Sequence, residues 1–137
     1  MSIFKRRKPV REPVIPEGPV EYPQGTCVET ESGKYLISGG KKFRIKHDEI
    51  FKSWNFPLVV KSSDKAIAHY PSSLRPLPFR DGTVVRDIYN LELHVFAAGK
   101  RIKIVTAEMF EHLGLEDRKI PMVSHEIVRA HPEGGTI

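Results

Sequence analysis

The residues of this sequence best suited to bind a metal ion or to transfer protons are its histidines. There are six of them: His47, His69, His94, His112, His125 and His131. No two are four residues apart and no His-x-His triplet occurs, so no pair has the spacing that places two imidazoles on one metal ion. His125 and His131, six residues apart, are a poor substitute. The sequence therefore predicts no metal site and no cofactor.

The acidic residues that could act as general acids or bases stand where helices are predicted to begin. Asp48, Glu49, Glu108 and Glu126 each fall in the first turn of a predicted helix. A carboxylate there complements the helix dipole, which explains these residues without a catalytic role. We therefore expect no enzymatic activity. Several buried titratable groups gathered in one pocket would argue against this expectation.

Two further features suggest chemistry but have simpler explanations. Cys27 is the only cysteine, so no intramolecular disulfide can form, and its alternating context predicts a small core residue instead of a reactive thiol. The run Ser38-Gly39-Gly40-Lys41 resembles a phosphate-binding loop in composition. It lacks the G-x-x-x-x-G-K-[ST] spacing, and predicted strands flank it on both sides. Gly39-Gly40 instead predicts a two-residue hairpin turn, because both positions can take positive φ.

The segment 25–70 predicts a small β-meander followed by short helices. Strands are expected at 25–30, 34–38 and 41–45. Asp48 is expected to cap a helix that carries Ile50, Phe51 and Trp54 at helical spacing and ends at Asn55. An extended piece at 56–60 follows, and Ser63-Asp64 opens a last helical turn that Pro71 ends.

After a proline-rich connector at 71–80, the same order of signals returns in 81–131. The segment Gly82-Thr83-Val84-Val85 corresponds to Gly25-Thr26-Cys27-Val28. Ala98-Gly99 corresponds to the Gly39-Gly40 hairpin turn. Thr106 is expected to cap the helix, Gly114 to end it, and Ser124 to open the last turn. The offset drifts from 57 to 61 residues and the drift falls at turns, which is typical of diverged repeats.

The predicted fold class is therefore α+β and β-rich, with two tandem repeats of a three-stranded meander and short helices. The predicted divisions are an extended N-terminal arm (1–24), repeat 1 (25–70), the connector (71–80), repeat 2 (81–131) and a tail (132–137). Each unit has about 45 residues, close to the size below which a chain cannot bury enough apolar surface to be stable alone. The recurring residues build a scaffold and include no nucleophile, paired carboxylate or metal ligand.

The arm carries the positive charge of the chain. The formal net charge is +5, and the first eleven residues hold five cations and no acid. Prolines at every third or fourth position predict an extended arm, suited to lie in a groove of a neighbouring subunit; a disordered solubilising tail is the alternative. The arm residues expected to bind a partner are the basic Lys5, Arg6, Arg7, Lys8 and Arg11 and the apolar Val14, Ile15, Val20 and Tyr22.

Two predicted strands also present basic faces. Their residues are Lys41, Lys42 and Arg44 in the first unit and Lys100, Arg101 and Lys103 in the second. They could contact phosphates of a nucleic acid, but cations on exposed strands also discourage aggregation. Because Glu29, Glu31, Asp87 and Glu92 lie on neighbouring strands, we expect ion pairs that leave the body neutral.

The chain has neither a predicted membrane span nor a predicted secretion signal. No apolar run approaches the roughly 18 residues that a spanning helix needs. The basic start is followed by Pro-Val-Arg-Glu-Pro, where a signal peptide would be apolar.

The shared pattern reads G-T-x-V, then [YL]-[LI]-x-x-x-G-K-[KR]-x-[RK]-I, a capped helix with aromatic or leucine residues, and V-x-S-[DH]. It resembles a repeat of bacterial cell-surface proteins and is similar to small two-repeat virion proteins of tailed phages that infect actinobacteria. The resemblance covers about residues 25–131 and implies a structural or adhesive module without catalytic residues. In the second unit Leu113 replaces Trp54 and Ala98 replaces Gly39, so the surface roles of these positions can differ between the two halves.

From these observations we expect a non-enzymatic structural protein of a multi-subunit assembly, a minor tail, connector or capsid-associated component of a phage virion. It would be made in the host cytoplasm and located in the virion, and its partners would be neighbouring virion subunits, with no membrane. The alternative is a nucleic-acid-binding module that uses the basic arm and strands. That alternative predicts binding that weakens steeply with salt.

Overall fold

The computed structural model describes residues 14–137 and shows a small α+β protein with two mixed β-sheets. The first sheet has four strands in the order β3-β2-β1-β4, and the second has five in the order β8-β5-β6-β7-β9. Within the described range the helices are short, none longer than the seven residues of α1 (Asp48–Trp54). The basic arm residues Lys5, Arg6, Arg7, Lys8 and Arg11 lie outside the described residues.

The first half begins with an antiparallel meander. Its strands are β1 (Cys27–Thr30), β2 (Gly33–Ser38) and β3 (Lys41–Ile45), close to the predicted ranges. After α1 the chain returns to place β4 (Val59–Lys61) parallel to β1, and α2 (Asp64–Ile67) follows. Strand β4 pairs in parallel with β1 and therefore forms the edge of the sheet opposite β3.

The second half also has three strands, a helix, a strand and a helix in this order, with two additional elements, η2 and β9. The meander consists of β5 (Val84–Asp87), β6 (Leu93–Ala97) and β7 (Lys100–Ile104). It is followed by α3 (Ala107–His112), the 3-10 helix η2 (Leu115–Asp117), β8 (Met122–Val123), which pairs parallel to β5, and α4 (His125–Arg129). The chain ends with β9 (Glu133–Thr136), which pairs parallel to β7.

The local signals that form the hairpins and helix ends are those the sequence predicts. Gly39 and Gly40 both take positive φ in the β2–β3 turn, and Ala98 takes the same strained conformation at φ 52° in the β6–β7 turn. The side chains of Thr106, Ser63 and Ser124 each accept a bond from a backbone N–H of the first helical turn. These bonds satisfy donors that a helix start leaves open.

Three expectations from the sequence are corrected. Asp48 is not the cap of α1: the helix begins at Asp48, and His47 is the N-cap, without a side-chain bond. The segment 132–137, expected as a tail, contains β9, because β7 offers it an unpaired edge. The expected three-stranded meanders are extended by the parallel strands β4 and β8, which were predicted only as extended pieces.

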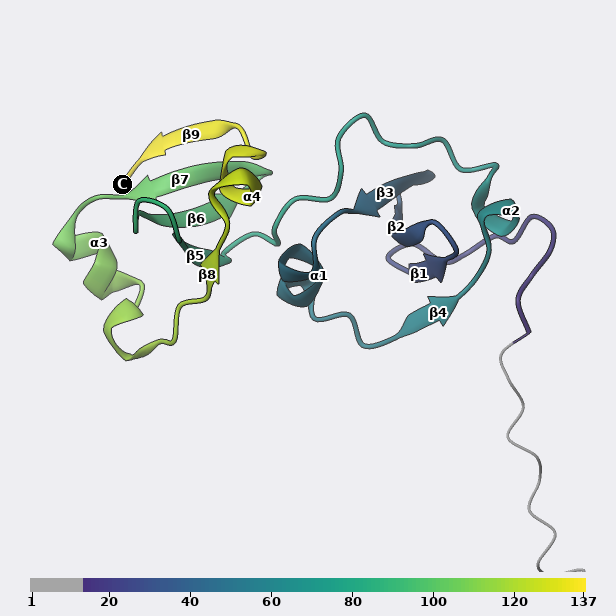
Figure 1. Ribbon diagram of the computed structural model, residues 1–137, viewed down its shortest axis with the longest axis horizontal. Helices are drawn as coiled ribbons and strands as arrows, with labels where there is room; N and C mark the ends of the chain where they lie inside the picture. The colour runs from purple at the N-terminus through teal and green to yellow at the C-terminus, as the bar shows by residue number, and fades with distance from the viewer. Residues whose placement is uncertain (1–13) are drawn as a thin grey trace, which may run out of the picture.

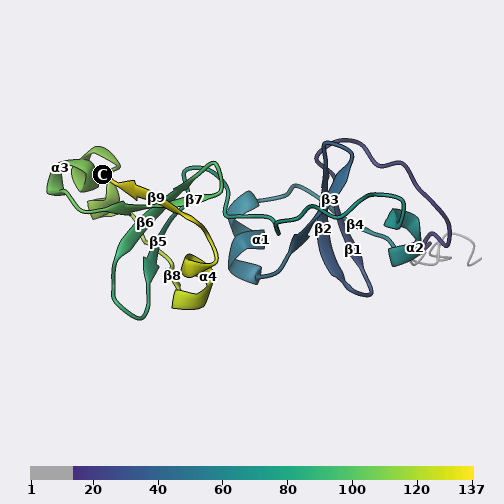
Figure 2. The same cartoon turned by 90° about the horizontal axis from the view of Figure 1, so that it is seen from above.

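The two sheets lie one after the other along the long axis of the molecule, with α1 between them (Figures 1 and 2). Helix α2 lies at the outer end of the first half and α3 at the outer end of the second. The described N-terminal end is on the side of α2, and the C-terminus is at the opposite end, near α3.

A single hydrophobic core joins the two halves. One cluster of buried residues includes Cys27 and Leu36 of the first sheet, Ile50 of α1, and Val85 and Phe96 of the second sheet. Cys27 is 1% exposed, which confirms the prediction of a small core residue, and burial raises the pKa of its thiol to about 11. Smaller clusters cover the outer face of each sheet.

The segment between the halves supplies the centre of this core. Phe79 is 1% exposed, and its ring centroid lies 4.6 Å from that of Phe96 and 5.3 Å from that of His131. The amide of Phe79 donates to Nε2 of His131 at 3.1 Å, and Nδ1 of His131 lies 2.9 Å from the carbonyl oxygen of Ile127. His131 therefore carries its proton on Nδ1, and both ring nitrogens are satisfied in the neutral form.

This arrangement predicts acid sensitivity. Burial lowers the pKa of His131, and burial likewise lowers that of His94, so the unfolded chain binds more protons than the folded chain below about pH 6.5. The free energy of unfolding is expected to fall as the pH drops from 7 to 5, with a slope of at most about 1.4 kcal/mol per pH unit for each histidine. Urea unfolding at a series of pH values measures this slope.

The matched variants are His131→Gln and His112→Gln. The first removes a buried titrating group and should flatten the profile, whereas the second changes an exposed side chain and should leave its shape unchanged. Equal slopes for the wild type and His131→Gln would contradict the assignment.

Candidate functional site

The described part of the predicted arm divides into an exposed and a packed section. Val14 is 90% exposed and Ile15 is 46% exposed. Further along, the amide of Val20 donates to the carbonyl of Ala66 at 3.0 Å, and Tyr22 packs against the outer cluster of the first sheet. Of these apolar arm residues, only Val14 and Ile15 are thus presented to a partner, while Val20 and Tyr22 are bound to the chain's own body.

The predicted basic strand faces are largely engaged within the chain. Nζ of Lys42 donates to the carbonyl of Ile67 at 3.4 Å, and Arg44 donates to the carbonyl of Ser32 at 3.2 Å. Lys41 is exposed at the hairpin. Two of the three first-unit cations are therefore partly used by backbone oxygens.

The second unit shows the same tendency. Arg101 donates to the carbonyl of His131, and Nζ of Lys103 forms an ion pair with Glu92 at 2.8 Å, one of the pairs the sequence suggested. Lys100 is exposed. The other acids named for this role bind elsewhere: Glu29 pairs with Lys61, Glu31 accepts from the amide of Asp64, and Asp87 bonds His125.

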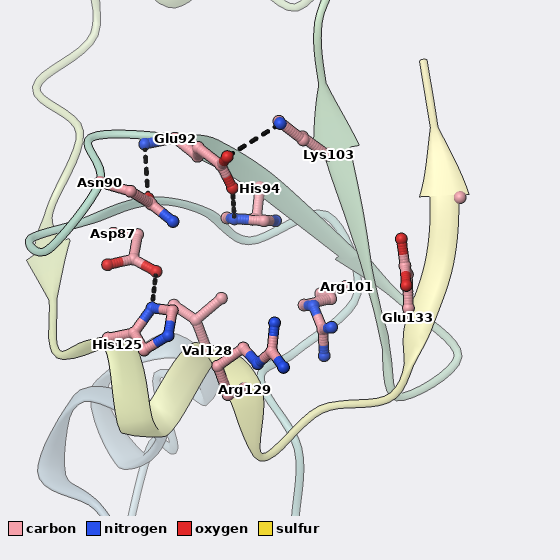
Figure 3. Close-up of a pocket in the computed structure, with 11 residues that line it drawn as sticks. Asp87, Asn90, Glu92, His94, Arg101, Lys103, His125, Val128, Arg129 and Glu133 are labelled. Carbon is pink, nitrogen blue, oxygen red and sulfur yellow. Dashed lines mark hydrogen bonds and ion pairs between the residues drawn. The ribbon is translucent and has the colours of Figure 1, made fainter.

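The most concentrated polar chemistry lies in a cavity of about 160 Å³ on the second sheet. Figure 3 shows that strands β6 and β7 form one side of it and α4 the other. Its walls include two histidines, three lysine or arginine residues and three acids: His94, His125, Arg101, Lys103, Arg129, Asp87, Glu92 and Glu133. This is the gathering of titratable groups that the sequence analysis did not expect.

Asp87 and His125 form a tight pair at the floor of the cavity. Asp87 is fully buried, and one carboxylate oxygen lies 2.6 Å from Nδ1 of His125 while the other accepts from the amide of Tyr89 at 2.8 Å. Burial by itself raises the pKa of Asp87, but these bonds outweigh it and leave the pKa below its usual range. The carboxylate fixes the orientation of the imidazole, whose Nε2 stays available.

His94, on β6, is the second histidine of the cavity. It is 4% exposed, and its Nε2 lies 3.6 Å from a carboxylate oxygen of Glu92. The hydrogen bond from Lys103 lowers the pKa of Glu92, so this acid is ionised beside the ring. Nδ1 of His94 is buried and has no hydrogen-bond partner in the described residues. A buried polar atom without a partner costs about 1–3 kcal/mol.

The first sheet has a matching hydrogen bond. Thr30 ends β1 and donates to Asp64, the first residue of α2, at 2.6 Å, as Asp87 ends β5 and bonds the first residue of α4. Both bonds tie a short helix to the end of a strand. We therefore interpret the Asp87–His125 pair first as a structural link.

The two sheets differ beside the cavity, which is also lined by β9, a strand of the second sheet. Tyr35 pairs with the second residue of β1, and His94 pairs with the second residue of β5. The hydroxyl of Tyr35 reaches Ser32 at 2.9 Å, and Ser32 bonds Asp64 at 2.6 Å, so a continuous network fills this side of the first sheet. His94 forms no comparable network: its Nε2 faces Glu92, and its Nδ1 has no hydrogen-bond partner among the described residues.

The chemistry available to the cavity is proton transfer and anion binding. Its lining contains no serine, threonine, cysteine or tyrosine that could act as a nucleophile. Among residues 14–137, no three His, Cys, Asp or Glu side chains lie together so that they could hold a metal ion. None of the helices in this part of the chain has the length and apolar character needed to cross a membrane.

Sequence reasoning missed this site, although one signal pointed to it. In β5 the buried Val85 and Asp87 share a face, so the alternation places a carboxylate on the core side of the strand. Comparison with known proteins gives no family assignment: no protein-family model and no curated protein matches the chain.

Proposed function

We propose that the chain is a non-enzymatic structural component of a multi-subunit assembly, a minor virion protein of a tailed phage, and that its body consists of two tandem repeats. The proposal rests on how the two halves of the body pack against each other. The inner face of the first half, formed by α1, packs against the second half, whereas the α3 face of the second half points outward (Figure 1).

Matching hydrogen bonds support the tandem repeat. The amide of Gly25 donates to the carbonyl of Ile37, and that of Gly82 donates to Phe96, both at 2.8 Å. The amide of Lys42 donates to Pro71 at 3.0 Å, and the amide at the equivalent position of β7 donates to Pro132 at 2.8 Å. These bonds lie at offsets of 57 to 61 residues, as the sequence pattern does.

The lead-in segments also correspond. The amide of Tyr22 donates to the hydroxyl of Tyr70 at 2.8 Å, and the amide of Phe79 donates to His131 at 3.1 Å. The residues before each meander are thus bound to the same place on their own half. This favours a repeat that includes the residues just before each meander, so that the segment around Tyr22 belongs to the body and the arm is shorter than 1–24.

The body would dock through the face of α3. In the first half, Trp54 of α1 donates to the carbonyl of Pro78 at 2.8 Å, and Ser53 accepts from the amide of Arg80 at 3.2 Å, so this helix holds the segment leading into the next unit. In the second half, no residue of α3 is buried, and Phe110 is only partly covered. We propose that a neighbouring subunit covers this helix and that the arm extends along an adjacent subunit.

Incorporation into particles tests the proposal. Deletion of residues 1–13, and separately Phe110→Asp, should leave the protein folded, because all buried residues of the described range 14–137 are kept and Phe110 lies only partly covered at the edge of its cluster. Both variants are expected to be depleted at least about tenfold from purified particles, compared by mass spectrometry with the wild type and with the surface control Lys65→Gln. Absence of the wild-type protein from particles, or undiminished incorporation of both variants, would contradict the proposal.

Nucleic-acid binding remains the second candidate because of the basic arm. It predicts that reversing the five arm charges abolishes binding and that affinity falls steeply with salt. Most basic residues of the two strand faces are bonded within the body, namely Lys42, Arg44, Arg101 and Lys103. The arm is therefore the main electrostatic contact with a nucleic acid in this alternative.

A further inference from the structure

The α3 face of the second half is less covered than the equivalent face of the first half. Leu36 pairs with the first residue of β1, and Val95 pairs with the first residue of β5. Leu36 is buried in the cluster that joins the two halves, whereas Val95 is only partly buried. Likewise α1 buries Ile50, and α3 buries none of its residues. The α3 face therefore lacks the cover that the second half gives to the first.

Inside the chain, this cover comes from the residues that precede a meander. Trp54 of α1 donates to the carbonyl of Pro78, and Phe79 lies in the same buried cluster as Leu36. By the proposed repeat, the residues that precede the first meander would cover an α3 face in the same way. They lie at the end of the molecule opposite α3 (Figures 1 and 2), so a second copy would have to supply them.

This N-terminal end presents two apolar side chains. Val14 is 90% exposed and Ile15 is 46% exposed. They lie beside α2, because the hydroxyl of Ser63, the N-cap of this helix, donates to the carbonyl of Pro16. The outer end of the first half therefore offers apolar contacts that its own core does not use.

The two ends also differ in charge. Residues 107–119, which contain α3 and η2, carry four exposed acids and two exposed cations: Glu108, Glu111, Glu116, Asp117, Arg118 and Lys119. None of the four acids forms an ion pair within the described part of the chain. The first 13 residues, directly before Val14, carry five cations and one acid. Opposite charges at two surfaces steer their association and select the partner.

We propose that a second copy of this chain covers the α3 face with its N-terminal end. This inference rests on the docking through α3 proposed above and names the partner. Val14 and Ile15 of one copy pack against Phe110 of the next, and the cations of the arm contact the acids of residues 107–119.

The contact joins two different surfaces, so each added copy leaves one free surface of each kind, and the copies form a row or a ring. The hydrogen bond from Trp54 to Pro78 has no counterpart in this contact, because Leu113 stands at the position of Trp54. The association between copies is therefore weaker than the junction inside the chain, and it is reversible.

Sedimentation velocity of the purified full chain, from about 10 μM to about 1 mM, measures this association. The sedimentation coefficient is expected to rise with concentration. Raising the salt from about 0.1 M to about 1 M shortens the Debye length from about 10 Å to about 3 Å and should weaken the association at least about fivefold. A wild-type chain that stays monomeric at about 1 mM would overturn the proposal.

Two variants, each with one blocked surface, identify the two surfaces that meet. Phe110→Asp blocks the α3 face, and Val14→Asp combined with Ile15→Asp blocks the N-terminal end. Each variant alone should associate at least about tenfold more weakly than the wild type. Mixed in equal amounts they should form a dimer and nothing larger, because one keeps its N-terminal end and the other its α3 face. A mixture that does not dimerise would contradict the proposal, as would undiminished association of the Val14 and Ile15 variant alone.

A second way to block the α3 face keeps the mixing experiment decisive if Phe110→Asp does not fold. Glu108→Lys combined with Glu111→Lys changes only exposed side chains and repels the basic arm. Leu74→Asp is the matched control, because Leu74 is a fully exposed apolar residue of the connector. It should leave the association unchanged, and a loss equal to that of Phe110→Asp would show unspecific apolar attraction and overturn the assignment.

The measurement needs no particle, so its outcome is separate from the test of the virion role. A chain that is monomeric in solution but incorporated into particles would overturn the contact between copies alone. A chain that associates as expected but is absent from particles would overturn the virion role alone.

Discussion

Phe79→Ala is expected to lower the free energy of unfolding by about 3–5 kcal/mol, the usual cost of truncating a buried aromatic side chain. The ring is 1% exposed and packs between Phe96 and His131, at the point where the cores of the two halves join. A cavity there would weaken both halves, because Phe79 belongs to the buried cluster that contains residues of both sheets. Urea unfolding followed by tryptophan fluorescence measures the effect, since Trp54 bonds the neighbouring Pro78.

Leu74→Ala is the matched control, because Leu74 lies in the same connector and is fully exposed. It should change the free energy of unfolding by no more than about 0.5 kcal/mol. A loss below about 1 kcal/mol for Phe79→Ala would mean that the halves do not depend on this contact.

Asp87→Ala is expected to cost about 2–3 kcal/mol. The carboxylate is fully buried and accepts bonds from both Tyr89 and His125, so its loss removes the acceptor of the Tyr89 amide and the partner of the imidazole. The imidazole of His125 is 40% exposed and regains water, which keeps the cost below that of breaking a fully buried ion pair. Glu116→Ala, an exposed acid on η2, is the control and should have almost no effect.

The first sheet supplies a rescue for this variant. The double substitution Asp87→Thr with His125→Asp copies the Thr30–Asp64 bond into the second sheet. It should recover most of the stability lost by Asp87→Thr alone, because strand and helix are tied again. A double variant that is as unstable as the sum of the single changes would argue that the pair is not a structural link.

The stability of the protein at low pH provides an independent test of the contribution of Asp87. Because the pKa of Asp87 is lower in the folded protein, its contribution is present above the ordinary aspartate pKa of about 3.9 and is lost as the pH falls below that value. The loss caused by the histidines begins nearer pH 6.5. The two contributions therefore occupy separate pH ranges and can be resolved in one titration of stability.

The parts of the fold that the sequence predicted are those fixed by neighbouring residues. The strand Lys41–Ile45 follows a Gly-Gly turn and alternates cleanly, and the helix caps at Ser63, Thr106 and Ser124 depend on bonds within one turn. Such signals act over a few residues and need no knowledge of the rest of the chain. The cap of α1 was displaced by one residue because Asp48 suits the first helical position as well as the cap.

The parts that escaped prediction depend on distant partners. The sequence predicts an extended segment at Val59 and Val60. Nothing near these residues indicates that they pair in parallel with the distant strand β1. Strand β9 contains two glycines and no alternation, and it forms because β7 presents an open edge. The polar cavity requires the docking of α4 against β5, so its histidine and carboxylate could not be matched from their spacing alone.

The shared core has a consequence for how the protein is made. During synthesis the first sheet can form before the second has left the ribosome, and it then exposes the apolar face that carries Leu36 and Trp54. The second half of another chain would fit this face as the chain's own second half does, because the segment 71–80 connects the two halves. At high concentration such nascent or refolding chains would exchange their second halves, and the products would be domain-swapped dimers in which the connector is the hinge.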